Sequence, residues 1–352
     1  MPDPSPPNGH AVRGRPITRQ DVMLRTLILF VAFLVCGCNG TVAPPPPPFW
    51  SAEEIRSLRT GQALDDYIKP RYQIFEKKIA HDGGFIFITT LAPRRPVSGP
   101  SVYKFSGGPG NDHISEIGVR RALAVYGDIA SKISFVAYSG SGGFDGALEK
   151  RLRRDGMASF EDDVAALAAV IDLWSEGGYI VDSGSLSTSI GLLTLSTNPS
   201  GHDDCALGVF LAPWTHYYPT DFVYDPANKP EPKWRRTLED RADDYRWMAR
   251  EFLHIDETVP FDDATPASDG RWWLASVRER TDIAEDVFVG IPSFENRMDR
   301  AVAIDFFEAL PSSVVWKSDY DFHVTMGASA KAQEATRAFV ESKLPLGSCE
   351  AD

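Results

Sequence analysis

The stretch VDSGSLSTSIG, from Val181 to Gly191, has a serine at every second position. Its serines are Ser183, Ser185, Ser187 and Ser189, and they lie between an apolar run that ends at Val181 and an apolar segment that begins at Ile190. Such a stretch is either a serine-rich polar loop or a turn in which one serine is a nucleophile with small neighbours. The rest of the chain decides between these two interpretations.

Composition limits the class of protein. The chain has 352 residues, of which 43% are hydrophobic, so it is long enough to bury a large core. Its formal net charge of −13 excludes binding through charge to nucleic acid or to an anionic membrane surface. We therefore expect a small-molecule or short-peptide substrate and no nucleic-acid partner.

The first residues predict export. Basic residues precede the apolar run Leu27–Val35, which is too short to span a bilayer because a spanning helix needs about 20 residues. Residues 1–37 therefore read as a signal peptide, with Met1 or Met23 as the start. The sequence Val35-Cys36-Gly37-Cys38 resembles a bacterial lipobox, which implies that Cys38 is lipidated and becomes the mature N-terminus. An ordinary cleaved signal peptide is the alternative.

The same resemblance gives a location. Asn39 after the lipidated Cys38 implies the outer membrane of a Gram-negative bacterium, with a domain that faces the periplasm and contacts the membrane only through its lipid anchor. Residues 38–50 form the tether, and the prolines Pro44–Pro48 predict a stiff polyproline II spacer of about 15 Å. Cys205 and Cys349 are either a disulfide in an oxidising compartment or unpaired cysteines, of which Cys205 would suit a core.

Apolar runs and turn residues predict the fold class, an α/β fold with a mostly parallel sheet flanked by helices. The predicted strands are 72–80, 85–91, 101–105, 132–138, 178–181, 206–211, 286–290 and 313–317. The predicted helices between and after them are 115–130, 160–174, 188–196, 300–310 and 329–342. The first two strands form an antiparallel hairpin at the edge. The core comprises 51–212 and 283–352, and the strand-poor insertion 213–282 is either a helical cap over the substrate or a helical excursion without substrate contact.

Ser185 fits a strand-to-helix turn that presents a nucleophile. Residues two before and two after such a nucleophile must be small, and here they are Ser183 and Ser187. The predicted strand ends at Val181 and the predicted helix begins at about Leu186. Ser187 is the alternative nucleophile, because it has the same alternation around it, but it lies farther from the predicted strand.

At these residues the chain resembles the α/β-hydrolase superfamily, and within it the prolyl and tripeptidyl aminopeptidases. That branch carries GGS-x-G-x-T-L and a proline fourteen residues after the nucleophile, and SGSLSTSIGLLTLSTNP aligns with it without a gap, so that Pro199 follows Ser185 at this spacing. The resemblance implies an α/β-hydrolase fold with Ser185 as the nucleophile. Two glycines of the motif are serines here.

A second motif supports the resemblance. The apolar run Val102–Phe105 leads into Ser106-Gly107-Gly108-Pro109-Gly110, where the branch carries HGGPG. The resemblance implies that the backbone N–H groups of Gly107, Gly108 and Leu186 form an oxyanion hole. Ser106 replaces the histidine of the motif, and the Asp-x-Arg-Gly-x-Gly motif of the branch is not matched at residues 138–143.

The acid and the base follow in the order that this fold uses, which is serine, acid, histidine. His323 comes just after the predicted strand 313–317, and Glu295 comes 28 residues before it. The resemblance implies His323 as the base and Glu295 as the acid that orients it. Asp299 is the alternative acid, and its other interpretation is a charge at a helix N-terminus. No metal or cofactor is expected.

These residues predict a serine hydrolase that cleaves an amide or ester bond with Ser185, His323 and Glu295. The resemblance favours an aminopeptidase-like peptidase. The alternatives are a carboxylesterase or lipase-like enzyme, and a catalytically inactive binding lipoprotein with the same fold.

Overall fold

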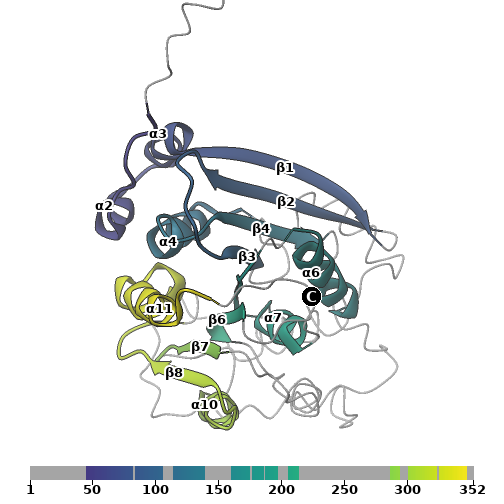
Figure 1. The fold of residues 1–352 in the computed structure, drawn as a ribbon. Coiled ribbons are helices and arrows are strands. Elements are labelled where there is room, and N and C mark those ends of the chain that lie inside the picture. Colours follow the sequence, from purple (N-terminus) through teal and green to yellow (C-terminus); the bar gives the residue numbers. More distant parts are fainter. Residues whose placement is uncertain are drawn as a thin grey trace, which may run out of the picture. The chain divides into compact units, whose positions relative to one another are not determined.

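The computed structural model describes residues 45–81, 84–105, 114–138, 160–174, 177–185, 187–196, 205–213, 286–293, 300–322 and 325–346. The described elements belong to one compact unit, Pro46–Asp352, and Figure 1 shows a sheet with helices on both sides. The predicted signal peptide and nearly all of the predicted cap lie outside the described residues.

The described strands form one eight-stranded sheet in the order β1-β2-β4-β3-β5-β6-β7-β8. The strands are β1 (Tyr72–His81), β2 (Gly84–Pro93), β3 (Ser101–Phe105), β4 (Lys132–Tyr138), β5 (Tyr179–Ser185), β6 (Ala206–Pro213), β7 (Asp286–Ile291) and β8 (Ser313–Lys317). Strand β2 is antiparallel to β1 and β4, and all other pairs are parallel. The predicted mostly parallel sheet with an antiparallel hairpin at its edge is confirmed.

Helices cover both faces of this sheet. They are α2 (Ala52–Ser57), α3 (Gly61–Arg71), α4 (Glu116–Tyr126), α6 (Phe160–Trp174), α7 (Ser187–Ser196), α10 (Arg300–Glu308), the 3-10 helix η2 (Met326–Ala328) and α11 (Ala330–Lys343). Neighbouring residues of the fully buried strand β6 point to opposite faces: Phe210 packs in one core cluster with α6, α7 and α10, and Val209 packs in the other with α2, α3, α4 and α11.

Strand β5 ends four residues later than predicted. The sequence prediction ends the strand at Val181, whereas β5 continues through Asp182, Ser183 and Gly184 to Ser185. The prediction was wrong because a charged residue in a buried parallel strand looks like the start of a loop, and only its partners from other elements make Asp182 compatible with burial.

Two short helices near the start of the domain were not predicted. The helix α2 begins after Ser51, which forms a capping box with Glu54, and α3 begins after Thr60, whose side chain accepts a hydrogen bond from the N–H of Ala63. These caps satisfy backbone donors at each N-terminus, so short segments become helical once they pack on the body. Helix α4 ends at Tyr126, four residues before its predicted end.

Residues 46–50, the end of the predicted tether, pack against the body. The guanidinium of Arg71 donates from Nε to the carbonyl oxygen of Pro48 at 2.8 Å and lies over the ring of Trp50. The Trp50 ring also contacts that of Tyr67, with 4.9 Å between centroids. The proline-rich segment therefore has a fixed point of attachment at α3.

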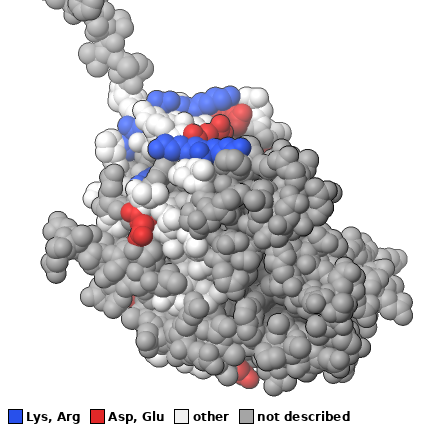
Figure 2. All heavy atoms as spheres, turned by 90° about the vertical axis from the view of Figure 1, so that its right-hand side faces the viewer, with Lys and Arg blue, Asp and Glu red and all other residues white. Residues whose placement is uncertain are grey.

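Strand β1 is an edge strand that carries charged residues. Glu76, Lys77 and Lys78 follow the exposed Ile74 and Phe75, and basic and acidic side chains lie side by side at the top of Figure 2. Lysines on an edge strand oppose the addition of a further strand. Among the described helices, none combines the length and the apolar character needed to cross a membrane.

Candidate active site

The carboxyl ends of β3 and β5 meet where the order of the sheet reverses. After β3 the chain passes through α4 to β4 on one side, and after β5 it passes through α7 to β6 on the other side. The two connections leave in opposite directions, so the ends of these neighbouring parallel strands flank a topological switch point, which is where open α/β sheets bind ligands. The last residues of the two strands are Phe105 and Ser185.

Ser185 has a strained backbone at this point. Its φ is 56°, and Ser185 and Ala212 are the non-glycine residues with positive φ in the described part of the chain. The register between β5 and β6 shifts here, so that Gly184 faces Leu211 whereas Ser185 faces Pro213 and Ala212 is skipped. A strained residue that ends a strand and precedes a helix is the backbone feature of a nucleophile turn.

Gly184 lets β6 pass close to this turn. A Cβ atom at Gly184 would lie 2.9 Å from the carbonyl oxygen of Leu211, which is a rigid backbone atom. No residue with a side chain fits there without moving a strand. The glycine is therefore required by the close approach of β5 and β6.

Ser183 occupies a position where the resembling family has glycine, and helix α7 makes room for it. Ser183 is fully buried, and a Cβ atom at Gly191 would lie 2.7 Å from its Oγ and 2.7 Å from Cε1 of Phe210. The helix therefore has a glycine opposite the extra side chain of the strand. The absence of a side chain at Gly191 explains how the turn tolerates a serine two residues before Ser185.

The hydroxyl of Ser187, the alternative nucleophile, forms hydrogen bonds with backbone atoms of the turn. The Ser187 side chain is buried, and its Oγ accepts a hydrogen bond from the N–H of Gly184 at 3.2 Å. The same hydroxyl donates to the carbonyl oxygen of Gly184 at 2.8 Å and reaches that of Phe105 at 3.4 Å. Ser187 thus bridges α7, β5 and β3, whereas Ser185 is partly exposed.

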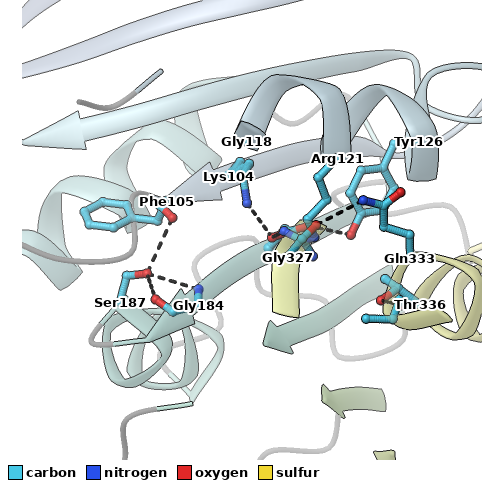
Figure 3. A network of polar contacts seen from close by, with 12 residues as sticks. Lys104, Phe105, Gly118, Arg121, Tyr126, Gly184, Ser187, Gly327, Gln333 and Thr336 are labelled. Atoms are coloured by element: carbon cyan, nitrogen blue, oxygen red, sulfur yellow. Dashed lines mark hydrogen bonds and ion pairs between the residues drawn. The ribbon is translucent and has the colours of Figure 1, made fainter. Parts of the chain in front are cut away.

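A buried charged cluster lies beside the turn, and the sequence analysis missed it. The carboxylate of Asp182, which is inaccessible to solvent, receives three donors. Arg121 Nη1 and Lys104 Nζ lie 2.7 and 3.1 Å from its Oδ1, and the Tyr126 hydroxyl lies 2.7 Å from its Oδ2. Figure 3 shows Lys104, Arg121 and Tyr126 converging on one place, beside Ser187, Phe105 and Gly184.

Burial and mutual charge shift the pKa values of this cluster. Burial alone raises the pKa of Asp182, but Arg121 and then Lys104 outweigh it, and the pKa falls below its ordinary value. Burial and then Arg121 lower the pKa of Lys104 to about 8, against the opposing effect of Asp182. Burial and then Asp182 raise the pKa of Tyr126. At neutral pH the cluster therefore holds two cations and one anion.

The cluster had a signal in the sequence. Lys104 lies inside the otherwise apolar run YKF, which is part of a predicted strand, and Asp182 directly follows Ile180-Val181, the apolar end of the predicted strand 178–181. Paired charges in adjacent buried strands would have indicated an ion pair. Arg121 and Tyr126 lie five residues apart on one helix and gave no comparable signal.

All of the other predicted site residues lie outside the described residues. They are Gly107 and Gly108 after β3, Leu186 between β5 and α7, Glu295 and Asp299 after β7, His323 after β8, and Cys38 near the start. The parallel strands β3, β5, β7 and β8 all end at the same edge of the sheet, so the chain enters each of these segments from the edge that carries Ser185. Within the described residues there is no group of three or more His, Cys, Asp or Glu side chains that could hold a metal ion.

No family model and no curated protein sequence matches the chain. Solved structures do. An esterase from Pyrobaculum calidifontis has 14% sequence identity and a TM-score of 0.52, with 94% of each chain covered. The peroxisomal α/β-hydrolase Lpx1 from Saccharomyces cerevisiae has 10% identity and a TM-score of 0.52, over 80% of this chain and 91% of that one.

A peptidase is also among these structures. An acylaminoacyl peptidase from Pyrococcus horikoshii has 10% identity and a TM-score of 0.56, over 84% of this chain and 45% of that one, so this chain spans less than half of the length of that peptidase. At such low identity the similarity concerns the fold. With its mostly parallel eight-stranded sheet, its helices on both faces and its strained turn after β5, the chain has the α/β-hydrolase fold.

Proposed function

We propose that this protein is a serine hydrolase that cleaves an acyl bond, with Ser185 as its nucleophile. The observation that carries the proposal is the positive φ of Ser185 at the carboxyl end of β5, at the switch point of the sheet. Strain of this kind costs about 1–3 kcal/mol and persists where the surrounding structure enforces it, which is common at active sites. The engagement of Ser187 with backbone atoms supports the choice of Ser185 over Ser187.

The mechanism uses residues that the sequence assigns. His323 removes the proton from the Ser185 hydroxyl, whose oxygen attacks the acyl carbonyl, and Glu295 holds the imidazole in the correct tautomer. The N–H groups of Gly107, Gly108 and Leu186 receive the negative charge that develops on the carbonyl oxygen. The histidine then gives its proton to the leaving group, and water, activated by the same base, releases the acyl group from Ser185.

The proposed substrate is a short peptide, cleaved from its amino end. The support is the resemblance of residues 106–110 and 183–199 to the aminopeptidase branch. Esterases and a peptidase are both found among proteins of similar fold, and both kinds of enzyme use acyl transfer to a nucleophile. A panel of aminoacyl-naphthylamides and p-nitrophenyl esters separates the two, and faster hydrolysis of the esters across the panel would replace the peptidase by a carboxylesterase.

A fluorophosphonate probe tests the nucleophile on the purified mature protein. We expect the probe to label the wild type on Ser185, as located by mass spectrometry, and Ser185→Ala to lose labelling and to lower kcat by about 10⁴-fold or more. Ser189→Ala, at another position of the same serine alternation, is the matched control and keeps its label. An adduct on Ser187 would move the nucleophile by two residues, and a folded wild type that takes no label would favour a binding protein without catalysis.

The acid is tested in the same assay. Glu295→Gln removes the charge that orients His323, so kcat should fall by about 10⁴-fold, whereas Asp299→Asn should change it little. The reverse result would assign the acid to Asp299.

We also propose that the protein is a lipoprotein of the outer membrane, attached through Cys38 and facing the periplasm. The lipobox-like sequence before Cys38 and the disulfide at Cys205 support this location, because disulfides persist in oxidising compartments. Cys38→Ala should remain unprocessed or leave the membrane fraction. If this variant still fractionates as mature protein with outer membranes, the anchor is not at Cys38.

A further inference from the structure

Lys104 and Asp182 form a link between the two strands that flank the switch point. They are partners in the register of β3 and β5, and Lys104 Nζ lies 3.1 Å from Asp182 Oδ1. Lys104 is the second-last residue of β3, and Asp182 lies three residues before Ser185. The ion pair therefore joins the strand ends within a few residues of the proposed nucleophile.

A second link joins the same two strand ends. The hydroxyl of Ser187 lies 3.4 Å from the carbonyl oxygen of Phe105, the last residue of β3, while it bonds to Gly184 in β5. Two residues after Phe105 the sequence reaches Gly107, the first of the proposed oxyanion donors. The backbone pairing of β3 with β5 runs as far as Lys104 and Asp182. Beyond it, the side-chain contacts that hold the end of β3 to the Ser185 turn are this ion pair and one longer contact.

Stability alone does not account for a charged pair at this place. Removing two charges from water costs several kcal/mol per ion, and apolar residues of similar volume often stabilise a core as well or better. The side chains of Lys104 and Asp182 are 15% and 0% exposed. A pair that is expensive to bury, and that lies at the site, is therefore a candidate for a role in the geometry of the site.

We propose that the Lys104–Asp182 ion pair sets the position of the end of β3 relative to the Ser185 turn, so that Lys104 is a positioning residue for acyl transfer. The role in acyl transfer rests on the proposed function, whereas the link between the strands does not. Arg121 and Tyr126 hold the same carboxylate, but they come from α4 and do not fix β3.

The surroundings of Lys104 make this link sensitive to pH. Among the described residues, the charged and titratable groups that face it are Asp182 on β5 and Arg121 and Tyr126 on α4. Arg121 and Tyr126 keep their protons. Burial lowers the pKa of Arg121, but Asp182 and Tyr126 outweigh it and the pKa rises. Burial and then Asp182 raise the pKa of Tyr126. Lys104, with its pKa lowered to about 8, is the group that changes charge near neutral pH, and its attraction to Asp182 weakens as it loses its proton.

Activity and stability should respond to this titration with opposite signs. The protonated ammonium holds β3 in place, so kcat should fall as the pH rises through about 8. Between about 8 and the ordinary value of 10.5, the unfolded chain binds more protons at this residue than the folded chain does. Lys104 therefore makes the free energy of unfolding increase with pH in that window. A loss of rate without a loss of stability separates positioning from unfolding.

The experiment measures kcat, KM and the melting temperature of Lys104→Met and Lys104→Arg from pH 6 to 9.5. We expect Lys104→Met to lower kcat by about 10- to 100-fold at pH 7 with KM nearly unchanged, because a small displacement at the reacting atoms has that effect. Its rate should show no decline near pH 8. Lys104→Arg, which stays charged, should restore most of kcat and also remove the decline.

Tyr126→Phe is the matched control. It removes a donor to the same carboxylate but leaves the pair between β3 and β5, so it should lower the melting temperature while kcat and the decline near pH 8 stay as in the wild type. A wild-type rate that is flat from pH 7 to 9.5, or equal loss of kcat in Tyr126→Phe and Lys104→Met, would overturn the proposal.

Hydrogen exchange provides a readout that does not depend on activity. At one pH, Lys104→Met should exchange amide hydrogens faster than Tyr126→Phe in peptides that contain Phe105 or Gly184, and equally in peptides from β7 and β8. Unchanged exchange at Phe105 and Gly184 would overturn the link even if the probe labels Ser185. If Lys104→Met exchanges faster at these peptides but the wild type takes no label, the link between the strands holds and the hydrolase function does not.

Discussion

Single residues near the turn show how a glycine in one element makes room for a side chain of another. The resembling family has glycine two residues before the nucleophile, and this chain has Ser183 there. The space for the hydroxymethyl group comes from Gly191 on α7, because a Cβ atom there would lie 2.7 Å from Ser183 Oγ. A side chain at position 191 would therefore compete with Ser183 for the same space.

A double-mutant cycle tests whether the side chains at positions 183 and 191 share space. Gly191→Ala should lower the free energy of unfolding by about 1–3 kcal/mol, because it overfills a packed core. Ser183→Gly in the Gly191→Ala background should recover part of this loss, since Phe210 still opposes the new methyl group. Chemical denaturation of the four proteins gives the coupling, which we expect at about 0.5–3 kcal/mol. Additive effects would show that the two positions do not share space.

As a matched control, Gly61→Ala places a methyl group at the start of α3, where the nearest atom is 3.5 Å away. It should leave stability unchanged or raise it by up to about 1 kcal/mol, because alanine is a better helix former than glycine. A loss there as large as that of Gly191→Ala would point to a general intolerance of the fold.

At the scale of elements, the start of α7 is tied to two strands. Ser187 is the first residue of that helix, and its hydroxyl contacts backbone atoms of Gly184 in β5 and of Phe105 in β3. From sequence alone, restoring glycine at position 187 would be expected to relieve crowding. The hydrogen bonds indicate the opposite, because any variant without the hydroxyl leaves buried backbone groups with fewer partners.

Ser187→Ala should therefore lower the free energy of unfolding by about 1–2 kcal/mol and still carry the fluorophosphonate label on Ser185. Ser196→Ala is the control, since that hydroxyl donates to the Leu193 carbonyl at the end of the same helix and is far along the chain from the turn. Loss of the label in a folded Ser187→Ala protein would contradict the assignment of Ser185.

For the molecule as a whole, a disulfide holds the start of β6. Cys205 is disulfide-bonded, and its partner lies outside the described residues, where the chain has Cys36, Cys38 and Cys349. The structure favours Cys349. A Cβ atom at Gly178 would lie 2.6 Å from Leu346 Cβ and 3.3 Å from the Cys205 carbonyl oxygen, so the chain passes close to Cys205 three residues before Cys349.

A peptide map without reductant should show Cys205 linked to Cys349. Cys349→Ala should lower stability by about 2–5 kcal/mol, since the bridge closes a long loop of the unfolded chain. Reduction of the wild type should have the same effect, and reduction of Cys349→Ala should add nothing. A free thiol at Cys205, or a peptide that links it to the N-terminal cysteines, would refute this pairing.

The sequence by itself determined the α/β class, the antiparallel hairpin at the edge and all eight of the described strands, though not every strand end. A strand that is buried on both faces, such as β6, has apolar residues at nearly every position. Such a run can be recognised from the local sequence alone. The serine alternation and the GGPG sequence likewise indicated a functional role for the two strand ends that flank the switch point.

Only the tertiary structure decided that β5 continues to Ser185, that Ser183 fits against Gly191 and that Asp182 is buried with Lys104, Arg121 and Tyr126. The physical reason is the same in each case. A buried charge in a strand needs partner groups, and a side chain at a crowded turn needs free space, and both are provided by other parts of the chain. The local sequence pattern therefore does not show whether such a residue can be buried.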